Sequence, residues 1–150
     1  MNYIRLCTLS LCFFVGGYRA VPFDIVLNPA MDICSTTGYL MMISLLMRVA
    51  PGGFHMTAPV CSTYTWINRA SSGRTANCPL GDDRKRRVAF ANLMVTRTIL
   101  ALVLCTARGL FWILEQPALS IMQSHPAFKL LRRIAENTCS TISDIFATIG

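Results

Sequence analysis

The stretch "FHMTAPVC", residues 54–61, predicts a short strand that leads into a loop carrying a cysteine. The mostly apolar run from Phe54 to Ala58 follows Pro51-Gly52-Gly53 and is closed by Pro59. A short apolar run between proline and glycine residues is typical of a core strand. We therefore expect a strand over residues 54–58, with Cys61 just beyond its carboxyl end.

A second strand with a long helix before it is predicted further along the chain. The run "LFWIL", Leu110 to Leu114, is wholly apolar and is followed by Glu115. The segment from Val88 to Ala107 predicts a helix, with Asp82-Asp83 as its N-terminal cap and Arg108-Gly109 as its end. Strands that alternate with helices of this length indicate an α/β fold with a parallel sheet.

The remaining elements are shorter. Thr37 to Val49 is apolar nearly all round and predicts a helix buried against the sheet. Residues 125–136 predict a short amphipathic helix, and Pro117 suits the first turn of another. The polar stretch 62–83 predicts a long loop of the kind that is usually functional or disordered.

Four residues with reactive or acidic side chains follow predicted strands. An extended piece over 20–23 ends at Asp24, and another around Met31 ends at Asp32. In parallel sheets the ligand lies beyond the carboxyl ends of the strands. The candidate site residues are therefore Asp24, Asp32, Cys61 and Glu115, with turn-forming aspartates and a structural loop cysteine as the alternatives.

The composition indicates a folded, basic protein. Of the 150 residues 53% are hydrophobic and 14% are charged, which argues against disorder and fits one domain. The net charge of +7 favours an acidic partner such as nucleic acid or an anionic membrane surface. The candidate nucleic-acid or anion contacts are Arg69, Arg74, Arg84, Lys85, Arg86 and Arg87, with a solvated charge run as the alternative.

Cysteine and histidine usage bears on metals and on localisation. The seven cysteines have no close C-x-x-C spacing and there are only two histidines, so no metal site is expected. Scattered cysteines favour a reduced, intracellular protein. Residues 1–17, however, have the outline of a signal peptide, which would make the protein secreted. A membrane span is not expected, because the uncharged run Thr98–Ala107 is too short to cross a bilayer.

Four short stretches together resemble a group of uncharacterised algal proteins and, more distantly, the class I methyltransferase core. These stretches are "VPFDI", "MDI", "GGFHMTAPVCSTYTW" and "FWILEQP". The closest chemical parallel is the cytosine-C5 methyltransferases, which place a Pro-Cys loop after the fourth strand and a Glu-Asn motif after the fifth. The resemblance covers roughly residues 18 to 128 in short motifs.

The resemblance implies S-adenosylmethionine as cofactor and a role for each strand-end residue. Asp24 would bind the ribose of the cofactor, and Asp32 would lie near its adenine. Cys61 would attack C6 of a flipped-out base while Glu115 holds N3. If the protein is an enzyme, it is then a methyltransferase that uses S-adenosylmethionine.

The sequence departs from the family pattern in ways that imply a truncated or degenerate copy. Val60 precedes Cys61 where the family has proline, and Gln116-Pro117 follows Glu115 where it has Asn-Val. Gly16-Gly17 lie too close to Asp24 for a helix to intervene. The expected fold is therefore a partial Rossmann-like sheet that lacks the first strand–glycine loop–helix unit and the last strands.

The predicted organisation is an apolar segment over 1–17, either a signal peptide or a remnant strand, a methyltransferase-like domain over 18–136 and a tail of uncertain structure over 137–150. Two alternatives stay open. One is a small basic secreted or membrane-associated protein without catalysis, and the other is a gene fragment that folds poorly.

Overall fold

The computed structural model describes residues 20–117, 119–138 and 148–149. The chain divides into two units with a boundary between Ser44 and Leu45. This boundary lies inside the predicted domain 18–136. Residues 1–17, on which the signal-peptide interpretation depends, lie outside the described residues.

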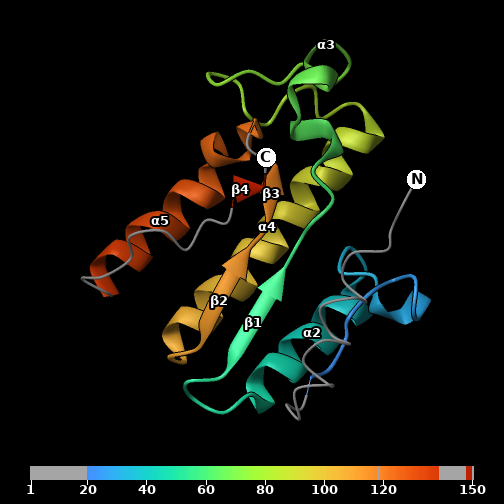
Figure 1. Cartoon of the computed structure of the whole chain (residues 1–150). Coiled ribbons are helices and arrows are strands. Elements are labelled where there is room, and N and C mark those ends of the chain that lie inside the picture. The colour runs from blue at the N-terminus through green and yellow to red at the C-terminus, as the bar shows by residue number, and fades with distance from the viewer. Residues whose placement is uncertain (1–19, 118, 139–147, 150) are drawn as a thin grey trace. The chain divides into compact units, whose positions relative to one another are not determined.

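The larger unit is built on two parallel strands, as the sequence predicts. Strands β1 (Phe54–Thr57) and β2 (Phe111–Leu114) pair with Phe54 opposite Phe111 and Thr57 opposite Leu114 (Figure 1). The ladder continues past both ends, since the N–H of Phe111 donates to the Gly53 carbonyl at 2.8 Å. Parallel neighbours need a long crossover connection, here residues 58–110. The predicted α/β class with a parallel sheet is confirmed.

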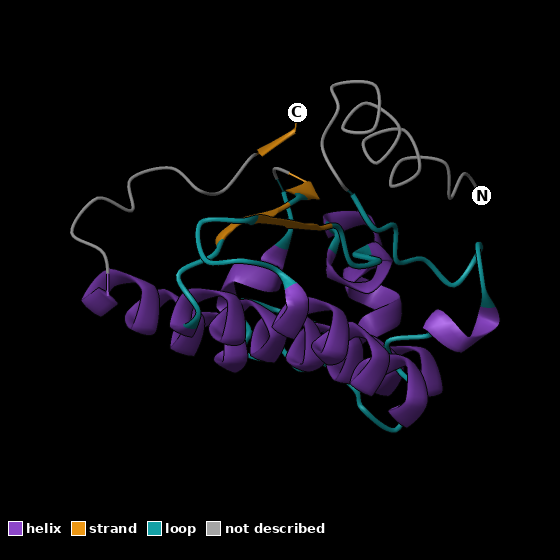
Figure 2. Cartoon of the chain, turned by 90° about the horizontal axis from the view of Figure 1, so that it is seen from below, coloured by secondary structure: helices purple, strands orange, loops and turns teal. Residues whose placement is uncertain are grey.

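Helix α4 (Arg86–Ala107) forms most of that crossover and begins two residues before the predicted start. It packs against β2 and against helix α5 (Pro126–Thr138), which confirms the helix predicted over 125–136. In Figure 2 the long helices lie on one side of the orange strands. The core consists of fully or almost fully buried side chains from these three elements, among them Val95, Ile99, Leu102, Cys105, Trp112, Leu114, Phe128 and Leu131.

The sequence of α4 explains its position and its end. Its buried residues recur every three or four positions, from Val88 to Cys105, so one stripe faces the core. Gly109 ends the helix with φ of 67°, a left-handed conformation that glycine adopts without steric cost. The N–H of Leu110 then donates to the Cys105 carbonyl at 2.9 Å, and β2 starts at the next residue.

By length and composition α4 is also long and apolar enough to cross a membrane, and it is the one such helix among the described residues. In its most apolar 18-residue window 44% of the residues are buried within the protein. The core helix of a soluble protein meets the same criteria. The described part of the chain therefore does not indicate a protein with several membrane spans.

The predicted strands before Asp24 and Asp32 are wrong. Residues 20–23 have no regular structure, and Pro29–Met31 form the 3-10 helix η1. Local side-chain bonds explain the difference, because Asp24 Oδ1 accepts from the Val26 N–H at 2.8 Å and Asn28 Oδ1 from the Ala30 N–H at 2.9 Å. Such bonds stabilise turns in competition with a strand ladder.

Helix α2 (Thr36–Arg48) confirms the helix predicted over 37–49 and spans the boundary between the units. Ser35 caps its start, since the Ser35 Oγ accepts from the Gly38 N–H at 2.9 Å. A Cβ on Gly38 would lie 2.1 Å from the Asp32 carbonyl oxygen, so the close approach of the two segments requires glycine.

Two other expectations need correction. Gln116–Pro117 forms strand β3, paired in parallel with β4 (Thr148–Ile149), instead of a helical first turn. A helix starts only after Ser120, whose Oγ accepts from the Met122 N–H and caps the 3-10 helix η4 (Ile121–Ser124). The predicted loop 62–83 contains three short helical pieces, η2 (Ser62–Tyr64), η3 (Trp66–Asn68) and α3 (Arg69–Ser72).

Candidate functional site

The carboxyl ends of β1 and β2 bring two of the predicted site residues to one end of the strand pair. The N–H of Glu115 donates to the Thr57 carbonyl at 2.9 Å, which aligns the residue after β2 with the end of β1. Cys61 follows β1 and starts η2, where its carbonyl accepts from the Tyr64 N–H at 2.8 Å. The negative charge of Glu115 acts on the Cys61 thiol. Cys61 and Glu115 therefore belong to one neighbourhood.

The environment of Cys61 keeps its thiol protonated. Burial raises the pKa of the Cys61 thiol, and the neighbouring Glu115 carboxylate raises it further, while a backbone hydrogen bond acts in the opposite direction. A reactive cysteine needs a lowered pKa, which cationic neighbours or a helix N-terminus provide. No such shift acts on Cys61. This arrangement gives little support to a thiolate nucleophile.

Alkylation rates test that conclusion. At about pH 8 we expect iodoacetamide to modify Cys61 at least tenfold more slowly than Cys78, because Cys78 carries an exposed free thiol and alkylation requires exposed thiolate. Glu115→Gln is expected to speed the modification of Cys61 about threefold by removing a negative charge that raises its pKa.

The readout is peptide mass spectrometry after timed quenching, and Glu136→Gln serves as the charge-matched control on α5. Equal rates for Cys61 and Cys78 in the folded protein would contradict the assignment of a protonated thiol.

Asp24 and Asp32 belong to the smaller unit, and both stabilise turns there. Asp24 uses one carboxylate oxygen for the Val26 N–H, and Asp32 accepts from the Cys34 N–H at 2.8 Å. Both side chains are partly exposed. The turn-forming alternative therefore describes what these two carboxylates do within the chain, and their predicted role toward a cofactor is left to experiment.

Arg74 is at the centre of a buried polar cluster beneath the segment 62–83. Its side chain has no exposed surface, and its guanidinium lies 3.7 Å from the centre of the Tyr64 ring. It donates to Asn92 Oδ1 at 2.8 Å, to the Val88 carbonyl at 3.3 Å and to the Pro79 carbonyl. This placement does not fit the predicted role as an anion contact, because a bound anion could not reach it.

Asn92 and His125 complete the cluster. Asn92 Oδ1 also accepts from the Tyr64 hydroxyl at 3.0 Å, while its amide donates to the Leu80 carbonyl at 3.0 Å. His125 meets the Tyr64 ring edge-on at 6.1 Å between ring centres. Burial, and then the charge of Arg74, lowers the pKa of His125 to about 4, so the imidazole is neutral at neutral pH. Nδ1 of His125 accepts from the Ala127 N–H at 3.2 Å.

Sequence reasoning missed Tyr64, Asn92 and His125 as partners of Arg74. The first and the last of the four residues are 61 positions apart in the chain, and no spacing motif connects them. The one available signal was a basic residue within a long structured loop. A buried cluster of this kind becomes visible only once α4 and η4 are packed against the loop.

The other predicted anion contacts lie at the surface or next to it. The Arg69 guanidinium stacks 3.9 Å above the ring of Trp66, which is 61% exposed. Arg84 forms an ion pair with Asp82 at 2.8 Å, and Lys85 lies 3.8 Å from the same carboxylate. Asp82 is therefore engaged by its basic neighbours and does not cap α4, contrary to the sequence expectation. The N-cap is Lys85, without a side-chain hydrogen bond.

Metal binding has no support in the described residues. No group of three or more histidine, cysteine or acidic side chains is placed to hold an ion there. Among the described cysteines, Cys61, Cys78 and Cys105 carry free thiols.

Comparison with known proteins found no family model that matches the chain, no matching curated protein and no matching solved structure. The assignment of function therefore rests on the chain itself.

Proposed function

We propose that this chain is a methyltransferase-like α/β domain, related to the cytosine-C5 enzymes, that binds ligand at the carboxyl end of β1 and β2 but does not catalyse methyl transfer through Cys61. One observation carries the proposal. The strand–crossover–strand unit brings Cys61 and Glu115 together after two adjacent parallel strands. That is the arrangement the resemblance implies for the fourth and fifth strands of a Rossmann-like methyltransferase sheet.

The electrostatics favour binding over catalysis. A thiol attacks the C6 atom of a pyrimidine only as the thiolate, and burial together with Glu115 raises the pKa of Cys61. Both histidines are neutral at neutral pH, since burial lowers the pKa of the half-buried His55 to about 4, and burial with the charge of Arg74 lowers the pKa of the buried His125 to about 4. Glu115 retains a carboxylate that can accept a hydrogen bond from a ring N–H.

The proposed cofactor is S-adenosylmethionine, with the ribose hydroxyls donating to Asp24. Asp24 is a half-buried carboxylate that uses one oxygen for its own turn, which leaves the other for a ligand hydroxyl. Asp32 is proposed to lie near the adenine. When bound, the cofactor would supply an electrophilic methyl group.

Calorimetric titration with S-adenosylhomocysteine tests the proposal. We expect micromolar binding to the purified, folded protein, weakened about tenfold by Asp24→Ala because a hydrogen bond to a charged group is lost. Asp83→Ala, an exposed acid in the other unit, is the control and is expected to leave the affinity unchanged. A cooperatively unfolding protein that shows no heat of binding would refute the cofactor assignment.

A further inference from the structure

Two large apolar side chains project from the short helix η3. Ile67 is 88% exposed and Trp66 is 61% exposed. Ile67 is the most exposed large apolar side chain among the described residues. Single exposed apolar residues are common, but two consecutive ones of this size leave an apolar surface uncovered. A side chain that is 88% exposed stands above its surroundings, so the pair forms a projection and not a groove.

Hydrogen bonds hold this projection in one conformation. The Asn68 side chain donates to the Ser62 carbonyl at 2.6 Å, and the Thr65 hydroxyl donates to the same carbonyl at 3.0 Å. The Tyr64 hydroxyl donates to Asn92 Oδ1 at 3.0 Å, which ties the segment to α4. The exposure of the two apolar side chains is therefore set by the fold, and a partner meets a surface that is already ordered.

The chain around the projection is basic. The Arg69 guanidinium stacks 3.9 Å above the ring of Trp66 and forms no ion pair with an acid among the described residues. Residues 66–87 include six basic and two acidic side chains, and one of these acids already pairs with two of the bases. The sequence has no aspartate or glutamate from residue 33 to residue 81. The charge at this end of the larger unit complements an anionic surface.

The size and shape of the projection favour a lipid surface over other partners. Together the two side chains expose on the order of 300 Å², whereas a stable protein interface buries about 800 Å² on each partner. A nucleobase would stack on Trp66 alone, on the ring face opposite Arg69, and would leave the more exposed Ile67 uncovered. A bilayer takes up small apolar projections, because basic residues and anionic headgroups supply the rest of the attraction.

We propose that η3 docks this protein on an anionic lipid bilayer, with Trp66 and Ile67 entering the headgroup region and Arg69 beside the lipid phosphates. Tryptophan prefers the membrane–water interface, because its ring is apolar and its N–H can donate to headgroups. The aliphatic stem of arginine packs on apolar surface while its charge stays with the phosphates. This docking surface contains no residue of the proposed ligand site, so the two proposals stand or fall separately.

Co-sedimentation of the full chain with lipid vesicles tests the proposal. We expect binding to phosphatidylcholine vesicles that contain about one-third phosphatidylserine to be at least tenfold stronger than binding to phosphatidylcholine alone, since each basic residue near an anionic surface contributes about fivefold. The binding should weaken as salt is raised from about 0.1 M to about 1 M, which screens the charges. Equal binding to the two kinds of vesicle would overturn the proposal.

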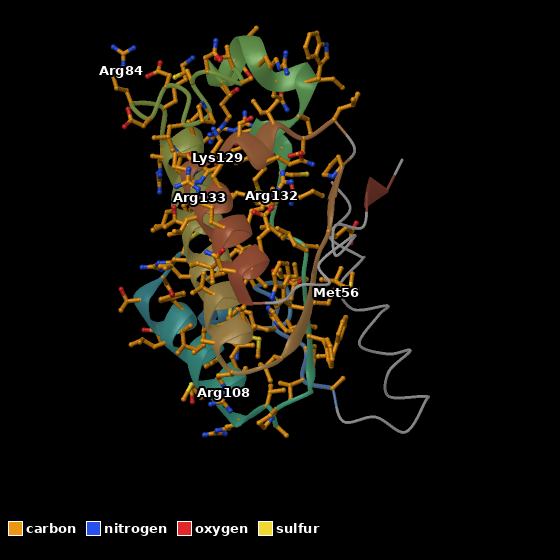
Figure 3. All side chains as sticks on the ribbon, turned by 90° about the vertical axis from the view of Figure 1, so that its left-hand side faces the viewer. Met56, Arg84, Arg108, Lys129, Arg132 and Arg133 are labelled. Carbon is orange, nitrogen blue, oxygen red and sulfur yellow. The ribbon has the colours of Figure 1, made fainter. Side chains whose placement is uncertain are left out.

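Ile67→Thr is the most specific variant, because it keeps a β-branched side chain and removes apolar surface from an exposed position. It should leave the unfolding temperature unchanged and weaken vesicle binding about fivefold. Phe111→Thr is the matched control, since Phe111 is 68% exposed but begins β2, at the other end of the strand pair. Figure 3 shows Arg108, just before β2, at the lower end of the larger unit, whereas the green helix α3, which directly follows η3, is at the upper end.

Two results with these variants would refute the docking surface. Equal losses of vesicle binding in Ile67→Thr and Phe111→Thr would mean general adhesion of apolar side chains. Unchanged binding of Ile67→Thr would mean that another segment, such as the apolar residues 1–17, carries the attachment.

The fluorescence of Trp66 reports directly on insertion. The second tryptophan, Trp112, is only 5% exposed, so a blue shift of the emission on adding vesicles comes from Trp66. Trp66→Phe should remove that shift while retaining most of the binding, because it keeps an aromatic ring. Binding without a blue shift would overturn the proposal, and quenching by a single-stranded oligonucleotide in its place would indicate base stacking instead.

Arg69→Gln separates the contribution of charge from that of apolar surface. It should weaken binding to the anionic vesicles about fivefold and leave binding to phosphatidylcholine unchanged. Arg133→Gln is the control, since Arg133 is exposed on α5 (Figure 3). Equal effects of the two charge variants would mean attraction to the overall net charge of +7, which contradicts a localised docking surface.

Discussion

Arg74→Ala is expected to lower the free energy of unfolding by about 4 kcal/mol. Arg74 is fully buried and supplies the hydrogen bonds of the Pro79 carbonyl, the Val88 carbonyl and Asn92 Oδ1. Alanine removes these donors and leaves an empty volume beside Tyr64. Asn92 Oδ1 keeps the Tyr64 hydroxyl as a donor, but the Pro79 carbonyl loses the Arg74 guanidinium, and a buried acceptor left unpaired costs roughly 1–3 kcal/mol. The gain from no longer burying a positive charge offsets part of that loss.

Two further variants separate volume from hydrogen bonding. Arg74→Met fills most of the space without donating, and we expect it to cost about 2 kcal/mol, roughly half the effect of alanine. Arg133→Ala changes the same residue type at an exposed position of α5 and should alter stability by less than about 0.5 kcal/mol. Urea unfolding followed by circular dichroism gives all three values. An Arg74→Ala protein as stable as Arg133→Ala would contradict the structural role of the cluster.

Gly81→Ala is expected to destabilise the same region by about 3 kcal/mol or more. Gly81 has φ of 64°, which costs a residue with a Cβ roughly 1–2 kcal/mol. A Cβ would also lie 2.6 Å from the Ser72 carbonyl oxygen and 2.6 Å from the Arg74 Cγ. The backbone of the turn must move to relieve the clash, and Arg74 must move with it.

Gly109→Ala is the matched control for this variant. Gly109 has a similar φ of 67°, but nothing lies within 4 Å of a Cβ placed there. We expect it to cost about 1 kcal/mol, the contribution of the backbone conformation alone. Thermal unfolding of both proteins measures the difference. Equal losses for the two variants would mean that the contact with Ser72 and Arg74 carries no energy.

The elements of the larger unit could be predicted because each has a local cause. Apolar runs bounded by proline or glycine identified both strands, and the periodic apolar stripe together with Gly109 identified α4. Helix α5 followed from its amphipathic pattern. Their approximate ends needed no tertiary information, since the signals are in the residues that start and stop each element.

Prediction failed where polar side chains near the backbone decided between two local structures. Asp24 and Asn28 each bond to an N–H two residues on, which favours a turn over the expected strands. Asp82 pairs with Arg84 instead of capping α4, so that the start of the helix keeps free donors. The sequence was compatible with either hydrogen-bond partner for each of these side chains. The geometry of the folded chain determined which partner each side chain contacts.

By itself the sequence determined the α/β class, the parallel strand pair and the long basic-ended helix, because hydrophobic periodicity and turn residues are local properties. Only the tertiary structure decided how deeply individual side chains are buried and which charges surround them. It buried Arg74 against Tyr64, raised the pKa of Cys61 beside Glu115, and left Ile67 exposed on η3. Burial and electrostatic environment depend on residues that are distant in sequence, so no local pattern encodes them.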